Sequence, residues 1–343
     1  MGIGNKIIWR GLGYMSNIRV GILGTNNITD WFLSGAKEVE GFELTAVYSR
    51  NENKAREYAS KYGVKDIFTN LEEMAKSDLI DAVYIATPNS LHAEQSILFL
   101  NNKKHVLCEK AFASNLEEVL AMIKAAKENK VLLMEAMKTT LLPNFQVVKE
   151  NLHRIGKVRK YFASFCQYSS RYDKYKNGEI LNAFKPELSN GALMDIGVYC
   201  IEPMINLFGK PRSIKANALM LESGVDGEGS IILDYEDKEG IVMFSKISNS
   251  YLPSEIQGEE GSIIIEKINT FEKIKLILKT GEEIDLSKEH VADNMFYEVK
   301  EFINLIKNNE LESQINTFET SINTITIMDE ARKQIGLVYP ADN

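Results

Sequence analysis

The sequence has 343 residues, of which 44% are apolar and 26% are charged, and its formal net charge is -8. This length allows two well-packed domains, and the negative charge argues against nucleic acid as the main partner. No stretch approaches the ~20 apolar residues of a membrane span. The three cysteines and four histidines are too scattered for a disulfide framework or a metal site. These features predict a cytoplasmic protein without a resident metal ion or a membrane partner.

The first 16 residues lack the long apolar core and the cleavage site of a secretion signal. We expect residues 1–16 to form an irregular extension, with Met15 as a candidate initiator. The first predicted strand follows directly after it.

Residues 17–140 alternate apolar strands with helical stretches. We expect strands over 18–23, 42–48, 82–87, 106–108 and 131–134, and helices over 27–38, 51–62, 91–100 and 114–127. Ser114 and Glu117 form a capping box for the last of these helices. Such alternation predicts a parallel sheet with right-handed crossovers, and apolar runs suit strands that are buried on both faces. The expected fold class is therefore α/β, with a Rossmann-type dinucleotide-binding domain over 17–140.

The segment from Ile18 to Thr29 runs from an apolar strand through a tight turn into a helix. A helix that follows such a turn offers free backbone N–H groups and a positive dipole end to a phosphate. In the fingerprint G-x-G-x-x-G/A only Gly24 matches, because Asn26 and Thr29 occupy the other two positions. Asn can adopt a left-handed backbone, so an ordinary strand–turn–helix and a phosphate loop both remain open. The candidate loop residues are Gly24, Thr25, Asn26, Asn27 and Ile28.

The residues that follow the other strands are mostly polar, small or charged. Ligands on parallel sheets bind outside the carboxyl ends of the strands. The candidate cofactor contacts at those ends are Ser49, Arg50, Thr87, Pro88, Asn89, Glu109, Lys110 and Glu135. Where NAD-binding folds place an acid on the ribose, this chain has Arg50 beside Ser49. Because a guanidinium pairs well with phosphate oxygens, this favours NADP over NAD, and a merely solvated Arg50 is the alternative.

Residues 141–337 are richer in strand. Strands are expected over 158–168, 214–221, 230–235, 241–248, 262–266, 273–278 and 283–286, and helices over 295–306 and 318–335. Short strands joined by turns predict a large, mostly antiparallel open sheet in an α+β domain. The domain boundary is expected near Pro143, and the last helix can pack back on the first domain.

One stretch of this second half, Asn190 to Cys200, is apolar nearly all round when it is read as a helix. Asp195 and Tyr199 lie four residues apart and therefore share one face. A buried carboxyl and a buried phenol both need partners. Either both groups are satisfied inside a core helix, or they form a proton donor that faces a substrate.

Four short motifs occur along the chain, Ala-Thr-Pro-Asn-Ser-Leu-His at 86–92, His-Val-Leu-Cys-Glu-Lys at 105–110, Met-Glu-Ala at 134–136 and the run from Gly191 to Tyr199. With these motifs, residues 17–337 resemble the glucose–fructose oxidoreductase, inositol dehydrogenase and rhizopine-catabolism (Gfo/Idh/MocA) family of NAD(P)-dependent oxidoreductases. The Asp-Ile-Gly-Val-Tyr form at 195–199 and Ser-Ser-Arg-Tyr-Asp at 169–173 look closest to its dihydrodiol dehydrogenase-like branch.

The resemblance implies hydride transfer between a nicotinamide cofactor and a secondary alcohol or carbonyl of a sugar, cyclic polyol or diol. It implies that Lys110 lies beside the nicotinamide, that Tyr199 is the acid/base phenol, and that Asp195 holds substrate hydroxyls or orients the pair. It also implies that His92 is among the cofactor contacts and that the open sheet builds a homodimer or homotetramer. A non-catalytic dinucleotide-binding sensor on the same fold is the alternative.

The pair of Lys110 and Tyr199 is chemically workable. Hydride transfer to a carbonyl builds negative charge on oxygen, and a donor must supply a proton. A free phenol has a pKa of about 10, and a nearby ammonium lowers it. In the family a proline usually follows the Glu-Lys pair, often through a cis peptide bond, whereas this chain has Ala111. Because a cis bond to a residue other than proline costs about 2.5–4 kcal/mol, we expect a trans peptide.

The substrate candidates of the second domain lie after the strand over 158–168. They are Tyr168, Arg171, Tyr172, Asn182 and Phe184, of which Arg171 and Tyr172 join Lys110, Asp195 and Tyr199 in the expected substrate site. Aromatic and hydroxyl-binding side chains suit a sugar or a cyclic polyol. A solvated strand end with its loop is the alternative.

Overall fold

The computed structural model describes residues 17–343, so the expected extension over 1–16, with Met15, lies outside the described residues. The first half of the described chain contains the strands β1 (Ile18–Leu23), β2 (Phe42–Tyr48), β3 (Asp66–Phe68), β4 (Ala82–Ile85), β5 (His105–Glu109) and β6 (Leu133–Ala136). Between them lie the helices α1 (Asn27–Ala36), α2 (Glu52–Lys61), α3 (Leu71–Lys76), η1 (Asn89–Leu91), α4 (His92–Asn101) and α5 (Leu116–Asn129). All strand pairs are parallel, in the order β3-β2-β1-β4-β5-β6. The order reverses between β1 and β4, as in dinucleotide-binding sheets, so the predicted Rossmann-type sheet is confirmed.

The second half builds an eight-stranded sheet in the order β14-β13-β12-β11-β7-β10-β9-β8. Its strands are β7 (Val158–Cys166), β8 (Ser213–Met220), β9 (Asp226–Asp234), β10 (Glu239–Ser245), β11 (Ser254–Gly258), β12 (Gly261–Glu266), β13 (Lys273–Leu278) and β14 (Glu283–Asp285). The helical elements are α6 (Lys138–Leu141), α7 (Pro143–Asn151), η2 (Leu152–Ile155), α8 (Tyr172–Lys176), η3 (Asn182–Phe184), η4 (Pro186–Leu188), η5 (Leu193–Gly197), α9 (Val198–Phe208), α10 (Phe296–Lys307), α11 (Phe318–Ile335) and η6 (Pro340–Asp342). The strand pairs are antiparallel except β7 with β10, which confirms the mostly antiparallel open sheet.

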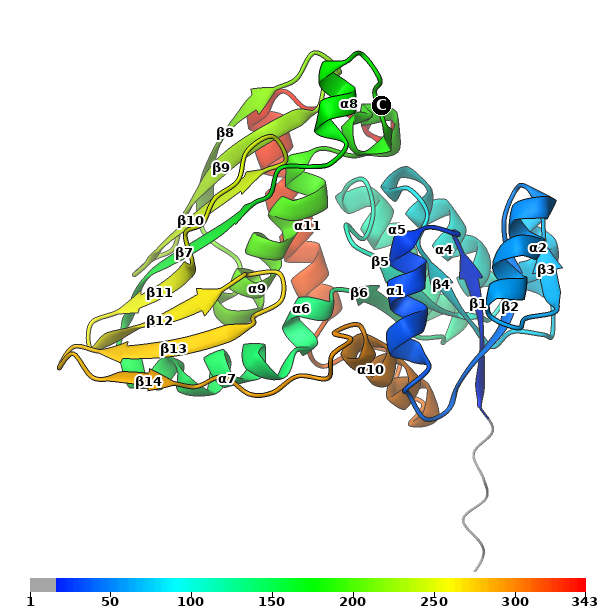
Figure 1. Ribbon diagram of the computed structural model, residues 1–343, viewed down its shortest axis with the longest axis horizontal. Helices are drawn as coiled ribbons and strands as arrows, with labels where there is room; N and C mark the ends of the chain where they lie inside the picture. Colours follow the sequence, from blue (N-terminus) through cyan, green and yellow to red (C-terminus); the bar gives the residue numbers. More distant parts are fainter. Residues whose placement is uncertain (1–16) are drawn as a thin grey trace, which may run out of the picture.

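Within residues 17–343, helices cover only one face of this second sheet. α9 packs on β7 and β10, α11 packs on β8, and α7 packs on β13, and Figure 1 shows these helices on the side that faces the first half of the chain. Along β8 exposed side chains alternate with partly buried ones, and along the start of β13 they alternate with buried ones, so the other face of the sheet is open. Apolar side chains remain accessible there, since Leu219 is 49% exposed and Ile232 is 46% exposed.

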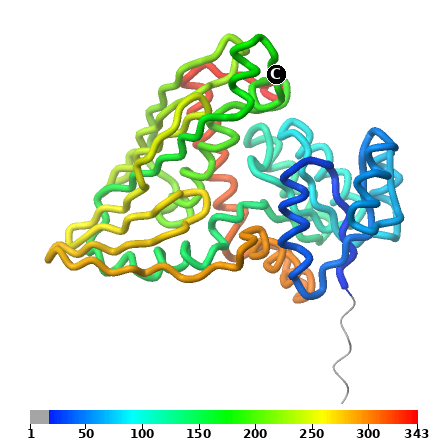
Figure 2. The backbone as a smooth tube through the Cα atoms, in the orientation of Figure 1, coloured from blue at the N-terminus to red at the C-terminus, as the bar shows by residue number. Residues whose placement is uncertain are grey.

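Two helices from the end of the chain connect the two halves. α10 packs on α1 and α6, whereas α11 packs on α5 as well as on α9 and β8. The contact between α1 and α10 is close, because a Cβ at Gly35 would lie 2.6 Å from the backbone nitrogen of Phe296. Figure 2 traces α11 in red between the large sheet and the first half, up to the C-terminus at the top of the view.

The sequence analysis did not predict two short strands, β3 and β11. β3 has 3 residues, and β11 reads Ser-Glu-Ile-Gln-Gly, with a single large apolar side chain. Each forms by pairing with longer neighbours, β3 with β2 and β11 with β7 and β12. Their sequence patterns are therefore too weak to mark them in isolation.

The expected capping box of α5 is shifted by one residue. Asn115, not Ser114, accepts a hydrogen bond from the Glu118 amide at 3.0 Å, and the Glu118 carboxylate accepts one from the Ser114 amide at 2.8 Å. The Ser114 hydroxyl instead accepts a hydrogen bond from Ser189 at 2.9 Å. Ser114, which the local sequence predicted as the cap of α5, therefore contacts a residue that is distant in the sequence.

One helical stretch, Pro186–Phe208, is long and apolar enough to cross a membrane by length and composition, contrary to the expectation that no stretch approaches such a span. Its most apolar window is 72% buried inside the protein. A buried helix of a globular domain is apolar all round for the same reason as a membrane span. This stretch therefore has the character of a core helix.

Candidate active site

Gly24 begins the tight turn between β1 and α1. Its φ is +106°, and a Cβ there would lie 2.6 Å from the Ala86 carbonyl oxygen, so only glycine fits. Asn26 is extended, with φ −121°, so it does not use the left-handed backbone that asparagine can adopt. Its side chain instead accepts hydrogen bonds from the Ile28 and Thr29 amides at 3.1 and 3.3 Å and donates one to the Ala86 carbonyl at 3.0 Å. The Thr29 hydroxyl donates to the Gly24 carbonyl at 3.1 Å, so the two residues that depart from the fingerprint hold the turn together.

The same edge of the sheet keeps free groups that suit an anion. The backbone N–H groups of Thr25, Asn26 and Asn27 form no hydrogen bond within residues 17–343, and they lie at the N-terminus of α1. Arg50 follows β2, the neighbour of β1; it is exposed and has no ion-pair partner in the described chain. The Ser49 hydroxyl beside it accepts a hydrogen bond from the Asn51 amide at 3.3 Å.

The loop after β4 consists of Thr87, Pro88 and Asn89. His92, at the start of α4, is fully buried, with Nδ1 2.9 Å from the Ala111 carbonyl oxygen and Nε2 2.9 Å from the Thr87 carbonyl oxygen. Both ring nitrogens are therefore used to connect the loops that follow β4 and β5. The Asn89 side chain donates to the Ser189 carbonyl at 2.8 Å and so joins the first sheet to the second half of the chain.

The peptide bond between Lys110 and Ala111 is cis, so the expected trans bond is wrong. The expectation used the cost for a free peptide and omitted the tertiary contacts of this loop. Ala111 is buried together with Phe112 and Ala113, and its carbonyl oxygen contacts His92. Packing around the loop decides its backbone conformation, which local sequence does not reveal.

Lys110, at the end of β5, meets Asp195 and Tyr199 from the second half of the chain. Its Nζ donates to Oδ1 of Asp195 at 3.1 Å and to the Asp195 carbonyl at 3.0 Å. The same Nζ lies 5.1 Å from the centroid of the Tyr199 ring. Asp195 lies in η5, a single π-helical segment of the kind that often occurs at functional sites. The three predicted catalytic side chains are thus brought together, and within residues 17–343 the Tyr199 hydroxyl has no hydrogen-bond partner.

A second lysine, which the sequence analysis missed, contacts the same carboxylate. Lys246 follows β10, and its Nζ lies 2.5 Å from Oδ2 of Asp195, the oxygen that Lys110 does not use. Its side chain is only 4% exposed. In the sequence it stands in Ser-Lys-Ile-Ser-Asn-Ser, at the polar end of the strand expected over 241–248. No local pattern distinguishes it from the surface lysines.

Burial and these contacts set the charges of the cluster. Burial raises the pKa of Asp195, but Lys246 and Lys110 outweigh it and hold that pKa well below its usual range. Burial lowers the pKa of Lys110, but Tyr199 and Asp195 raise it above its ordinary value. Burial raises the pKa of Tyr199, and Lys110 offsets this only in part, so the expected lowering is wrong. At neutral pH Lys110 is therefore an ammonium, Asp195 a carboxylate and Tyr199 a protonated phenol.

Two further candidates, Glu109 on β5 and Glu135 on β6, are buried. The Tyr84 hydroxyl donates to Glu109 at 2.6 Å, and the Ser321 hydroxyl donates to Glu135 at 2.6 Å. Burial raises the pKa of both carboxyls, that of Glu135 to about 7. Their side chains contact protein groups, so we do not place them against a ligand.

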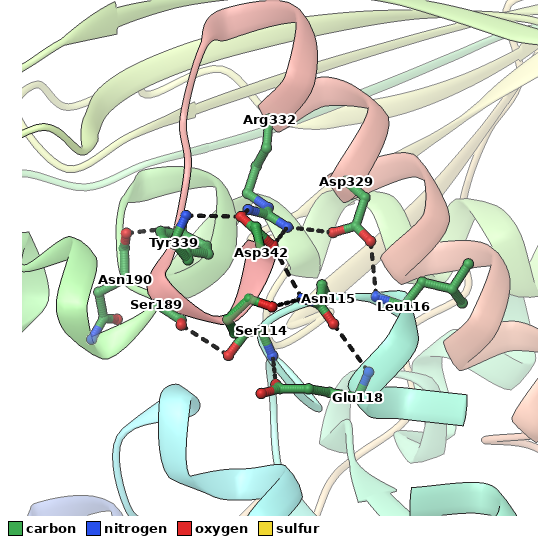
Figure 3. A network of polar contacts seen from close by, with 11 residues as sticks. Ser114, Asn115, Leu116, Glu118, Ser189, Asn190, Asp329, Arg332, Tyr339 and Asp342 are labelled. Atoms are coloured by element: carbon green, nitrogen blue, oxygen red, sulfur yellow. Dashed lines mark hydrogen bonds and ion pairs between the residues drawn. The ribbon is translucent and has the colours of Figure 1, made fainter. Parts of the chain in front are cut away.

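The segment that leads into η5 is fixed from several sides. The Asp226 carboxylate accepts a hydrogen bond from the Leu193 amide at 2.6 Å, and the Tyr339 hydroxyl donates to the Asn190 carbonyl at 2.9 Å. Figure 3 shows that Tyr339 belongs to a polar network around Arg332, which joins the start of α5, the end of the chain and this segment. The network therefore connects the Lys110 side of the site to the Asp195 side.

The aromatic substrate candidates adjoin this cluster. The Phe184 ring centroid lies 5.2 Å from Nζ of Lys246, and the ring packs on Tyr172 at 5.8 Å. Tyr172 packs in turn on Tyr168 at 5.6 Å. Together these three rings form a row that begins at Lys246.

Arg171 and Asn182 are not brought to the cluster by any contact in the described chain. Arg171 is exposed and has no ion-pair partner within residues 17–343, and its amide donates to the Ser169 hydroxyl at 3.2 Å. Asn182 begins η3. The structure gives neither residue a contact with Lys110 or Tyr199.

Comparison with known proteins agrees with this architecture. The family "Oxidoreductase family, NAD-binding Rossmann fold" matches residues 18–137, and the "GFO/IDH/MocA C-terminal domain" matches residues 146–264. The chain is 57% identical over 325 residues to scyllo-inositol 2-dehydrogenase (NADP(+)) IolU of Bacillus subtilis, covering 95% of this chain and 99% of that protein. It is 31% identical over 340 residues to trans-1,2-dihydrobenzene-1,2-diol dehydrogenase of Danio rerio, covering 95% of this chain and 99% of that protein.

A solved structure of similar fold is KijD10, a 3-ketoreductase from Actinomadura kijaniata in complex with TDP-benzene and NADP. It matches with a TM-score of 0.79 at 22% identity, covering 93% of this chain and 98% of that one. At this identity the likeness concerns the fold. The two family matches and the curated relatives confirm the resemblance predicted from the motifs, and the chain belongs to the Gfo/Idh/MocA family of oxidoreductases.

Proposed function

We propose that the chain is an NADP-dependent dehydrogenase that interconverts a secondary alcohol of a cyclic polyol, scyllo-inositol or a close relative, and the corresponding ketone. The observation that carries this proposal is the convergence of Lys110, Asp195 and Tyr199 at the carboxyl end of β5. The relative that is 57% identical over nearly its whole length is named as an NADP-dependent scyllo-inositol dehydrogenase. The alternative of a non-catalytic sensor gives no reason for these three groups to meet.

The cofactor would lie along the carboxyl edge of the first sheet. The amides of Thr25, Asn26 and Asn27, which have no partner among the described residues, fit a pyrophosphate. The guanidinium of Arg50, which forms no ion pair in the same part of the chain, fits a 2′-phosphate. Thr87, Pro88, Asn89 and Lys110 would complete the site, whereas we assign His92, Glu109 and Glu135 to holding the protein scaffold. A bound nicotinamide cofactor would supply the hydride donor or acceptor for the substrate carbon.

The protein's own groups would handle the proton. In ketone reduction the substrate oxygen gains negative charge, and Tyr199, which is protonated at neutral pH, can donate its proton to that oxygen. The Lys110 ammonium, 5.1 Å from the Tyr199 ring, stabilises the developing charge. Alcohol oxidation needs the reverse transfer, so a base form of this pair must be present and the oxidation rate should rise with pH.

The proposal is tested by assaying the purified protein with NADP⁺ and NAD⁺ against cyclic polyols, dihydrodiols and aldoses, and with NADPH against the corresponding ketones. We expect turnover of inositols and of an inosose, with NADP(H) preferred. Binding of NADPH, seen by its fluorescence, without turnover of any member of the panel would favour the sensor.

Arg50 offers a separate test of cofactor choice. We expect Arg50→Gln to raise the KM for NADP⁺ by about 10- to 100-fold, since a charge-assisted contact to phosphate contributes roughly 1.5–3 kcal/mol, and to leave the KM for NAD⁺ nearly unchanged. Arg56→Gln removes the same charge from a guanidinium that pairs with Glu52 at 2.5 Å and serves as the control. An equal change for both cofactors would contradict the assignment.

We also propose the assembly and location of the protein. A homodimer or homotetramer through the second sheet is supported by its uncovered face, where a groove of about 950 Å³ runs past Ile264, Ile277 and the exposed Tyr251. Light scattering that gives a monomer would contradict it. Three unpaired cysteines suit a reducing cytoplasm, which we propose as the location of the protein. We also propose that the boundary between the two domains lies near residues 140 and 141.

A further inference from the structure

Hydrogen bonds of its backbone and its side chain fix Lys246 beside Asp195, the partner of Lys110. Its backbone amide donates to the Gly227 carbonyl at 2.9 Å, and its carbonyl accepts a hydrogen bond from the Ser169 amide at 2.8 Å. Its ammonium contacts Oδ2 of Asp195 at 2.5 Å and the Ala183 carbonyl at 3.4 Å. Because the side chain is only 4% exposed, it acts inside the protein and not by meeting a ligand from solvent.

We propose that Lys246 is a positioning residue for proton transfer, which acts through Asp195 on the pair of Lys110 and Tyr199. This inference rests on the proposed dehydrogenase function and adds a residue to it. Lys246 binds Oδ2 of the Asp195 carboxylate, and Oδ1 of the same carboxylate orients Lys110. It also adds a positive charge that favours release of a proton from the pair.

Three charged side chains, Lys110, Asp195 and Lys246, meet at this site. If the Asp195 carboxylate contacted Lys110 alone, its whole negative charge would stabilise the protonated form of Lys110. Two ammonium groups on the two oxygens of Asp195 share its negative charge, so each is held less strongly. Removal of a neighbouring cation favours the protonated forms of both an amine and a phenol.

Other charged groups face the same residues and remain when Lys246 is changed. Lys110 is faced by Asp195 and Tyr199 from η5 and α9, Glu109 from β5, Glu135 from β6 and His92 from α4, while Lys246 is faced by Asp195 and by Asp226 from β9. These groups are the same in every variant below. A change in pH dependence therefore reports the loss of the Lys246 charge.

The test is the pH profile of kcat for alcohol oxidation in Lys246→Met, which keeps an unbranched side chain one atom shorter and removes its charge. We expect the acidic limb of the profile to shift to higher pH by about one unit, which is the lower end of the pKa shift that a neighbouring charge produces. At neutral pH this corresponds to a loss of about 10-fold in kcat, which is recovered at higher pH. The melting temperature and NADPH binding are measured on the same samples.

Two variants separate this role from a merely structural one. Lys246→Arg keeps the charge and should keep the position of the limb, whereas Lys238→Met removes a partly buried lysine that pairs with Asp237 at 2.6 Å, away from Asp195, and should not move it. A lower melting temperature and a kcat reduced equally at all pH values would overturn the inference and leave Lys246 as a packing residue. If the unaltered enzyme turns over no polyol, the proposed function fails. If it is active and the limb does not move, only the role of Lys246 fails.

Discussion

Replacing Lys110 by Met is expected to lower kcat for polyol oxidation by roughly 10²–10⁴-fold, the range for loss of a positioned acid–base group. The reason is geometric, since the Lys110 ammonium comes from the first sheet and contacts both Asp195 and the Tyr199 ring from the second half. Lys246 stays on Asp195, so the variant does not leave that carboxylate without a cation. Steady-state kinetics and NADPH titration measure the effect, and the affinity for NADPH should change far less than kcat.

A matched control exists at the other end of the same strand. Lys104 directly precedes β5 and donates hydrogen bonds to the Ser77 and Ile80 carbonyls at 2.7 and 2.9 Å. Lys104→Met removes a partly buried lysine from the edge of the sheet opposite the site, so it should lower the melting temperature without a large change in kcat. Equal losses of kcat in the two variants would contradict a catalytic role for Lys110.

Tyr199→Phe tests the phenol without disturbing its packing. The ring would still lie edge-on against Phe165 at 5.7 Å and beneath the Lys110 ammonium, and only the hydroxyl is lost. We expect a fall in kcat comparable to that of Lys110→Met, with an unchanged melting temperature. If Tyr199→Phe keeps more than half of the activity, the proton must come from another group, and the assignment of Tyr199 is wrong.

The parts of the site that the sequence predicted depend on local pattern. Apolar runs placed β1, β4 and β5, and the residues after each run are the ones that line the carboxyl edge of the sheet. The spacing of Asp195 and Tyr199 placed both on one helical face, and Lys110 reaches both. A parallel sheet brings its strand ends to one edge, so these positions follow from the order of elements.

The parts that the sequence did not predict depend on contacts between distant segments. Asn26 holds the turn through the Ala86 carbonyl, and the loop after Lys110 is fixed by packing and by His92. Lys246 is buried only because β10 ends beside η5. The raised pKa of Tyr199 comes from burial, which a pair of residues considered alone does not reveal.

The second large expected effect concerns Arg332 in α11. Its contacts join α11 to the last residues of the chain and, through Asp342, to the start of α5. Its guanidinium contacts Asp342 at 2.6 Å and Asp329 at 2.7 Å, and it lies 4.5 Å from the Tyr339 ring centroid. The side chain is 4% exposed. In Figure 3 its side chain extends from α11 toward Asp342 in the last residues, and Asn115 at the start of α5 donates to Asp342 at 3.1 Å.

We expect Arg332→Gln to lower the free energy of unfolding by roughly 3–5 kcal/mol, because removing one member of a buried ion pair leaves its partners uncompensated. For a chain of this size that corresponds to a melting temperature lower by about 4–7 °C, which calorimetry measures. The exposed pair of Arg212 and Asp234, at 3.4 Å with side chains 58% and 55% accessible, is the matched control. Arg212→Gln should cost less than about 1 kcal/mol, the usual worth of a surface pair.

The same variant should also weaken catalysis beyond its effect on folding. Tyr339 holds the Asn190 carbonyl at 2.9 Å, and Asn115 begins the helix that follows the Lys110 loop. Loosening this network therefore loosens the two segments that bring Lys110 to Asp195. We expect kcat of Arg332→Gln, measured well below its melting temperature, to fall while the KM for NADP⁺ stays within about 2-fold, because the Gly24 turn is not part of the network. Unchanged kcat in a destabilised but folded variant would show that the network supports the fold alone and does not position the site.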